Sequence, residues 1–179
     1  MNLFKETSVY DVGLTILSAV SVALSGVGRP PARVLMYPGT VAWDNCDCGQ
    51  LALGVTTHFN SRDTVNDSSN MHQNCTAPAR VASYALSIVR CVPGTDINGT
   101  PPVPGALTNA FQIQESDAYL VWHTVQCQLT AMENVNQPGG PTIIAGIVLD
   151  QIVLQTSGMC TGTELHFKAS WTRDDCQCS

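Results

Sequence analysis

Apolar residues recur every three or four positions near the start of the chain, which predicts an amphipathic helix of about four turns. The helix is expected to begin at Ser8, where Ser-Val-Tyr-Asp resembles a capping box with Asp11 in place of the usual Glu. Gly26 and the Pro30-Pro31 pair predict its end, because proline cannot continue a helix. Such a helix must lay its apolar face on another element.

Alternation with a period of two predicts strands in the middle of the chain. A short apolar strand is expected at 33–37, ended by Pro38-Gly39, and a half-buried strand at 51–59. The segment 79–92 is apolar on both faces, which is typical of a central position in a sheet.

The second half of the chain predicts a helix and then two more strands. Residues 106–132 have a helical pattern, expected as two segments broken near Ser116-Asp117. Strands are predicted at 142–156 and 163–171. The order of elements predicts one α+β domain, 1–179, with an N-terminal helix and a second helix packed on a mostly antiparallel sheet.

The connections are long and polar. Residues 60–78 carry hardly any core-forming side chains, and 93–105 holds four prolines and three glycines. A loop as long as 60–78 is expected to be functional or mobile. The final two strands are expected to be joined by residues 157–162.

The net charge of the chain limits the classes of partner that it could bind. The formal net charge is −6, with eight Lys and Arg among 179 residues and no basic cluster. Sequence-specific nucleic-acid binding and docking on anionic lipid are therefore not expected. Polar residues interrupt the apolar run at 9–24, so no membrane span is predicted. No signal peptide is expected either, because Glu6 offsets Lys5 before the run and the segment after Gly26 is a poor cleavage site.

Eight cysteines are the most distinctive chemical feature, and two Cys-x-Cys pairs account for four of them. An even number favours disulfides that supplement a core. Cys127, on the second predicted helix, is expected to be a buried free thiol. The candidate disulfide cysteines are Cys46, Cys48, Cys75, Cys91, Cys160, Cys176 and Cys178.

A zinc site made by the two Cys-x-Cys pairs is the alternative, but their spacing is tighter than that of common structural zinc sites. A cysteine nucleophile is disfavoured, since neighbouring aspartates raise a thiol pKa. No nucleotide-binding glycine motif is present. The sequence therefore predicts no catalytic residue, no metal and no cofactor, and a protein that is not an enzyme.

Two tryptophans flank the cysteine pairs. Trp43 adjoins the first pair and Trp171 precedes the last, so they are either interface anchors or caps on the core. Arg62 and Asp63, in the first long loop, are further candidates for an interface.

Several segments resemble the tail terminator family, neck proteins of long-tailed bacteriophages that infect actinobacteria. The resemblance spans nearly the whole chain, and the loops 60–78 and 93–105 and the C-terminal Cys-Gln-Cys depart from it. The segments that carry it are Tyr10-Asp-Val-Gly-Leu14, Tyr37-Pro-Gly-Thr-Val-Ala-Trp-Asp-Asn-Cys-Asp-Cys-Gly49, Ala85-Leu-Ser-Ile-Val-Arg-Cys-Val-Pro93, Ser116-Asp-Ala-Tyr119 and Gly158-Met-Cys-Thr-Gly-Thr-Glu164.

The resemblance implies a structural virion protein at the head–tail junction, present in the host cytoplasm during assembly. Six copies would form a ring that ends the tail tube and joins it to the head-side connector, with the genome passing through the lumen. Its partners would be further copies, the tail tube protein and the connector or stopper. The alternatives are a head-to-tail stopper or another connector ring, and a secreted disulfide-stabilised binding or hydrolytic domain.

Overall fold

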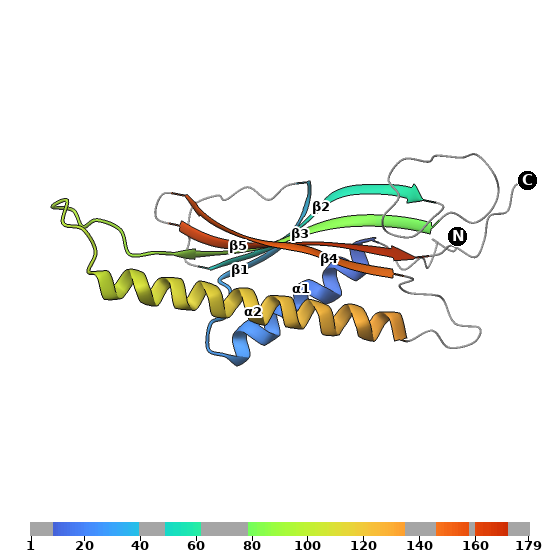
Figure 1. Cartoon of the computed structure of the whole chain (residues 1–179), viewed down its shortest axis with the longest axis horizontal. Coiled ribbons are helices and arrows are strands. Elements are labelled where there is room, and N and C mark those ends of the chain that lie inside the picture. The colour runs from blue at the N-terminus through green and yellow to red at the C-terminus, as the bar shows by residue number, and fades with distance from the viewer. Residues whose placement is uncertain (1–8, 40–48, 62–78, 135–145, 158–159, 172–179) are drawn as a thin grey trace, which may run out of the picture.

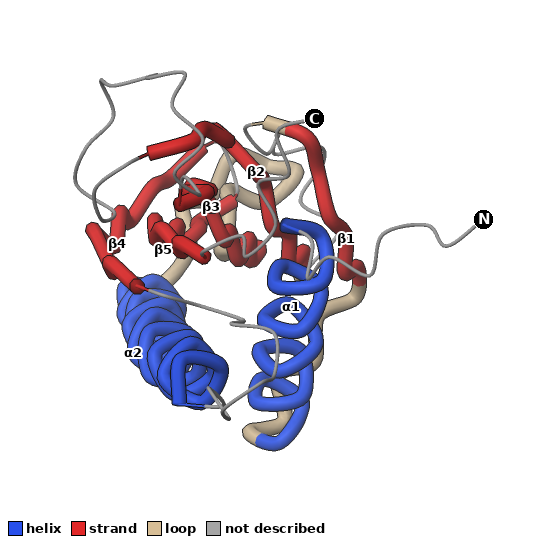
Figure 2. The backbone as a smooth tube through the Cα atoms, turned by 90° about the vertical axis from the view of Figure 1, so that its right-hand side faces the viewer, coloured by secondary structure: helices blue, strands red, loops and turns tan. Residues whose placement is uncertain are grey.

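The computed structural model describes residues 9–39, 49–61, 79–134, 146–157 and 160–171. Two helices lie on one face of a five-stranded sheet (Figures 1 and 2), so the predicted α+β class is confirmed. The elements in chain order are α1 (Val9–Gly26), β1 (Arg33–Pro38), β2 (Gln50–Ser61), β3 (Ala79–Cys91), α2 (Pro104–Asn134), β4 (Gly146–Ser157) and β5 (Cys160–Trp171).

The strand order is β1-β2-β3-β5-β4, which places β3 at the centre of the sheet, as its two apolar faces predicted. Strand β1 pairs with β2 in parallel, and every other pair is antiparallel. The sheet is therefore mixed but mostly antiparallel. Its two edges are β1 and β4.

Helix α1 ends in a Schellman motif centred on Gly28 rather than at Gly26 alone. The N–H of Arg29 donates to the carbonyl of Leu24 at 2.9 Å, and the N–H of Gly28 donates to that of Ser25 at 3.0 Å. Gly28 has a φ of 75°, which a residue with a side chain adopts at a cost. The predicted N-cap Ser8 lies outside the described residues.

By length and composition, α1 is the one described helix that could cross a membrane. Its polar interruptions therefore do not exclude a span, contrary to the expectation from sequence. The indication is weak, because a helix packed in a core meets the same criterion and α1 buries six residues.

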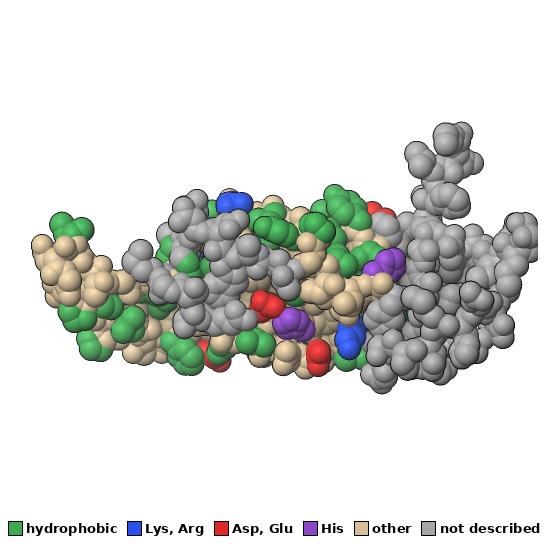
Figure 3. Space-filling model, turned by 90° about the horizontal axis from the view of Figure 1, so that it is seen from above, with side chains coloured by type: hydrophobic (Ala, Val, Ile, Leu, Met, Phe, Trp, Pro, Cys, Tyr) green, Lys and Arg blue, Asp and Glu red, His purple; other side chains and the backbone are tan. Residues whose placement is uncertain are grey.

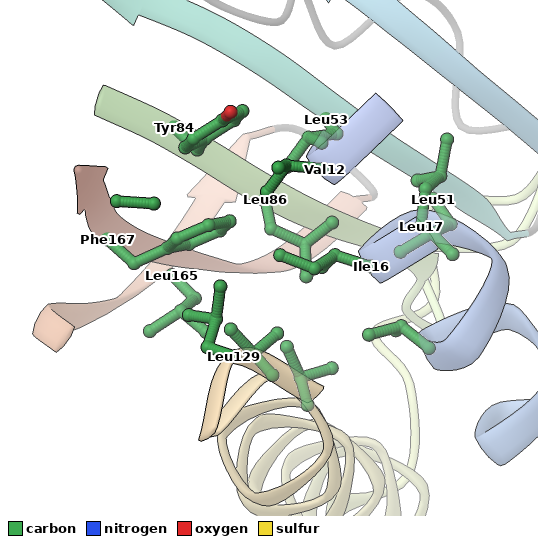
Figure 4. Packing of buried hydrophobic residues seen from close by; sticks show 14 of the residues in the cluster. Val12, Ile16, Leu17, Leu51, Leu53, Tyr84, Leu86, Leu129, Leu165 and Phe167 are labelled. Atoms are coloured by element: carbon green, nitrogen blue, oxygen red, sulfur yellow. The ribbon is translucent and has the colours of Figure 1, made fainter. Parts of the chain in front are cut away.

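One hydrophobic core joins both helices to the inner face of the sheet (Figure 4). Tyr84 and Phe167 stack with ring centroids 4.9 Å apart, and the Tyr84 hydroxyl donates to the carbonyl of Val9 at 3.0 Å. Burial raises the pKa of Tyr84 well above its ordinary value. The labelled core residues are Val12, Ile16, Leu17, Leu51, Leu53, Tyr84, Leu86, Leu129, Leu165 and Phe167.

Gly13 lets α1 approach the sheet closely. A Cβ at this position would lie 2.6 Å from Met36 Cε and 2.8 Å from Leu53 Cδ2, closer than atoms pack. We expect Gly13→Val to lower the free energy of unfolding by about 1–3 kcal/mol through overpacking. Urea denaturation would measure the change, with Gly105→Val as control, since among the described residues no side chain or other element lies within 4 Å of a Cβ there. Equal effects at the two glycines would contradict this explanation.

Helix α2 corrects two sequence predictions. It begins at Pro104, so Pro104 and Gly105 belong to the helix and not to the predicted loop. It is one helix of 31 residues, unbroken at Ser116-Asp117. The break was wrong because Asp117, which disfavours a helix interior when solvated, is buried here against two arginines. Proline at the first position removes an N–H that has no partner in the helix.

Two loop boundaries also differ from the predictions. Asn60 and Ser61 extend β2, where they pair with β3, and 62–78 lies outside the described residues. Residues 160–162 belong to β5 and pair with both β3 and β4, so the connection from β4 is shorter than predicted. In both places cross-strand hydrogen bonding extends a strand into a polar segment.

Candidate functional site

A buried ion-pair network ties α2 to the rest of the molecule. Arg29 Nε donates to Asp117 Oδ1 and Arg90 Nε donates to Asp117 Oδ2, each at 2.9 Å. The Asp117 side chain is 1% exposed, whereas those of Arg29 and Arg90 are 26% and 16% exposed. Arg90 also donates to the carbonyl of Arg29, and Arg29 donates to the Ser116 hydroxyl. The segment after α1, the end of β3 and the middle of α2 are thereby fixed together.

A second polar cluster lies one helical turn away. Gln114 Nε2 donates to the carbonyl of Gly162 at 2.8 Å, and the Thr161 hydroxyl donates to Gln114 Oε1 at 2.6 Å. Gln114 and Thr161 are both buried, so these bonds satisfy groups that water does not reach. They connect α2 to the first residues of β5.

A pocket of about 520 Å³ opens at this end of the sheet, beside the ion pairs. Arg29 and Arg90 line it together with apolar residues from α2, among them Ala110 and Ile113. Both arginines share one carboxylate, so the pocket wall carries an excess positive charge in a protein whose net charge is −6. The pocket therefore favours an acidic group attached to an apolar segment.

Helix α2 and the connection before it project past the strand ends (Figure 1). Large apolar side chains are exposed on this projection: Leu107 is 45% exposed, Phe111 55%, and Ile97 fully. The connection folds back at Asp96, which accepts hydrogen bonds from the backbone N–H groups of Thr100 and Asn98. These bonds, with that from Thr100 first, hold the pKa of Asp96 below its ordinary value.

A smaller apolar hollow of about 380 Å³ lies at the other end of α1, against the edge strand β1. Val9 and Tyr10 line it from the helix, and Met36 and Tyr37 line it from the strand. Tyr10 and Leu14 are exposed beside it, and the acidic residue Asp11 lies between them in the sequence.

The face of the sheet that the helices leave uncovered carries a mixture of residue types (Figure 3). On β5, His166 Nε2 lies 2.7 Å from Glu164 Oε1. Ser87, the residue of β3 opposite Glu164, is fully buried, and its hydroxyl has no hydrogen-bond partner among the described residues. Ala52 on β2 and Ala85 on β3 lie on the same face and are buried.

Two of the predicted disulfide cysteines lie on neighbouring strands. Cys91, at the end of β3, and Cys160, at the start of β5, are partners in register, with Cys91 exposed and Cys160 buried. The pairing of the cysteines stays a prediction, because the other five lie outside the described residues. Those are Cys46, Cys48, Cys75, Cys176 and Cys178.

The predicted interface residues are mostly untested. Trp43, Arg62 and Asp63 lie outside the described residues, and Trp171 ends β5 in register with Arg80. Sequence reasoning did not find the exposed side chains of α2 or the arginine-lined pocket. The apolar pattern of α2 could have indicated these exposed side chains, because the pattern continues unchanged into the projecting turns of the helix.

Cys127 is exposed, which corrects its prediction as a buried thiol. It lies two residues from both Val125 and Leu129, which face the core, so it points away from the core. Its sulfur lies 3.9 Å from the His123 ring nitrogens. Helix geometry brings any residues four apart together, so this contact alone defines no catalytic centre. Within the described ranges, no three His, Cys, Asp or Glu residues are grouped so as to hold a metal ion.

Comparisons with known proteins give matches among solved structures but none among sequences. The chain matches no protein-family model and no curated protein sequence. Among solved structures, it is similar to a chain of the virion of a native gene transfer agent particle, with 12% identity and a TM-score of 0.49. The alignment covers 93% of this chain and 96% of that one.

Proposed function

We propose that this protein is a structural component of a phage virion at the head–tail junction. It forms a ring of six copies that ends the tail tube and joins it to the head-side connector. The proposal rests on the sequence resemblance to tail terminators, which spans nearly the whole chain. The fold agrees with what that resemblance implies, since an N-terminal helix packs on a mostly antiparallel sheet.

The surfaces of the described residues support a protein that acts by assembly. Exposed leucine, isoleucine and phenylalanine side chains gather on a projecting segment, and such patches on soluble proteins usually mark interaction sites. We propose that the protein blocks growth of the tube and docks onto the connector through complementary surfaces, without catalysing a reaction. Its partners are then further copies, the tail tube protein and the connector, and the genome passes through the ring.

Phage lacking this gene product should test the function directly. If the ring ends the tube, electron microscopy of the lysate should show headless tails of variable length beside filled heads. Supplying the protein from a plasmid is the control and should restore tails of uniform length. Tails of uniform length without the protein, beside filled heads that lack tails, would contradict the terminator role and favour a stopper. Intact virions would contradict a neck role altogether.

A further inference from the structure

The core-facing side of α2 continues beyond the core. Its buried residues Ala118, Val125 and Leu129 share one face, because steps of four and seven residues return to the same side of a helix. The same spacing extends backwards to Phe111 and Leu107, which are exposed because the strands end before them. The helix therefore presents an apolar face that nothing in the described part of this copy covers.

Two arginines lie at this same end of the sheet, with Glu115 exposed one turn of α2 from Phe111. Arg29 and Arg90 share the one carboxylate of Asp117. We call this end the receiving surface, defined by Arg29, Leu107 and Phe111.

The opposite character is found at the start of α1. Tyr10 is 56% exposed and Leu14 45%, and the exposed acidic residue Asp11 lies beside them. We call these three residues the inserting surface. The helix has 18 residues, so at about 1.5 Å per residue its start lies roughly 25 Å from the receiving surface at its other end. The two surfaces therefore cannot meet within one copy.

We infer that copies of this chain associate head to tail, with the inserting surface of one copy against the receiving surface of the next. Tyr10 and Leu14 cover the exposed apolar side chains of α2, and Asp11 brings a carboxylate to the arginines. A contact between two different surfaces repeats from copy to copy and closes into a ring when the rotation permits. The inference rests on the proposed function, which requires a ring, and names the surfaces that build it.

Two substitutions test the contact, each disabling one surface. Leu14→Glu places a charge in the inserting surface, and Phe111→Glu places one in the receiving surface. Both side chains are about half exposed in a single copy, so each variant should fold with the circular dichroism spectrum of the unchanged protein. Val22→Glu is the matched control, because Val22 is exposed on α1 outside both surfaces.

Sedimentation velocity should show rings for the unchanged protein and for Val22→Glu, and monomers for each of the other two variants. Each substitution should raise the dissociation constant by roughly tenfold or more. An equal mixture of Leu14→Glu and Phe111→Glu should form dimers and nothing larger. In that mixture the intact receiving surface of the first variant meets the intact inserting surface of the second, and each dimer then presents only disabled surfaces.

Three results would overturn the inference. They are an unchanged protein that stays monomeric at its highest soluble concentration, variants that associate normally, and a mixture that stays monomeric. The phage experiment is independent of this one. Dimers in the mixture together with normal tails in phage lacking the protein would keep the contact and reject the neck function. Tails of variable length in phage lacking the protein, together with normal association of the two variants, would keep the neck function and reject the contact.

Discussion

Asp117→Asn should lower the free energy of unfolding by about 3–5 kcal/mol, the cost of breaking a buried ion pair from one side. The Asp117 carboxylate accepts from two guanidinium groups at 2.9 Å and is 1% exposed. A neutral amide would leave Arg29 and Arg90 close together without a compensating charge. The loss would be a large part of the 5–15 kcal/mol that usually stabilises a domain.

Urea denaturation followed by circular dichroism would measure this change. Glu115→Gln is the control, because it makes the same chemical change on the same helix at an exposed position, and it should have almost no effect. Replacing Asp117, Arg29 and Arg90 together with Leu, Met and Met should recover most of the loss, since no buried charge then remains. Equal effects of Asp117→Asn and Glu115→Gln would show that the network contributes little.

Phe167→Ala should have the second large effect, lowering the free energy of unfolding by about 3–5 kcal/mol. Phe167 is 1% exposed, lies on the helix-facing side of β5 and stacks on Tyr84 (Figure 4). Its removal leaves a cavity in the middle of the core and takes away the stacking partner of Tyr84. Because Tyr84 also holds the start of α1 through its bond to Val9, that end of the helix should loosen as well.

Tyr119→Ala is the matched control for Phe167→Ala, since Tyr119 is an aromatic residue that is 73% exposed on α2. Its replacement should change stability by less than about 1 kcal/mol. Native-state hydrogen exchange should further show faster exchange in the first half of α1 for Phe167→Ala than for Tyr119→Ala. A similar loss of stability from both changes would contradict the central place of Phe167 in the core.

The local patterns predicted the elements well where burial alone decided them. The helix at 9–26, the strand at 33–38 and the central position of β3 all follow from which residues must avoid water. The spacing of apolar residues along the sequence shows this property directly. The α+β class follows from the order of those elements. The apolar face of α2 is also visible in the sequence, through Leu107 and Phe111 to Leu129.

The tertiary structure alone decided which residues meet. Asp117 lies 88 residues from Arg29 and 27 from Arg90, so no local pattern could show that a residue expected to break a helix is buried within it. The parallel pairing of β1 with β2, the arginine-lined pocket and the exposure of Leu107 and Phe111 likewise depend on where the strands end in space. Sequence periodicity records the side of an element that is apolar, whereas only the packed structure determines whether another element covers that side.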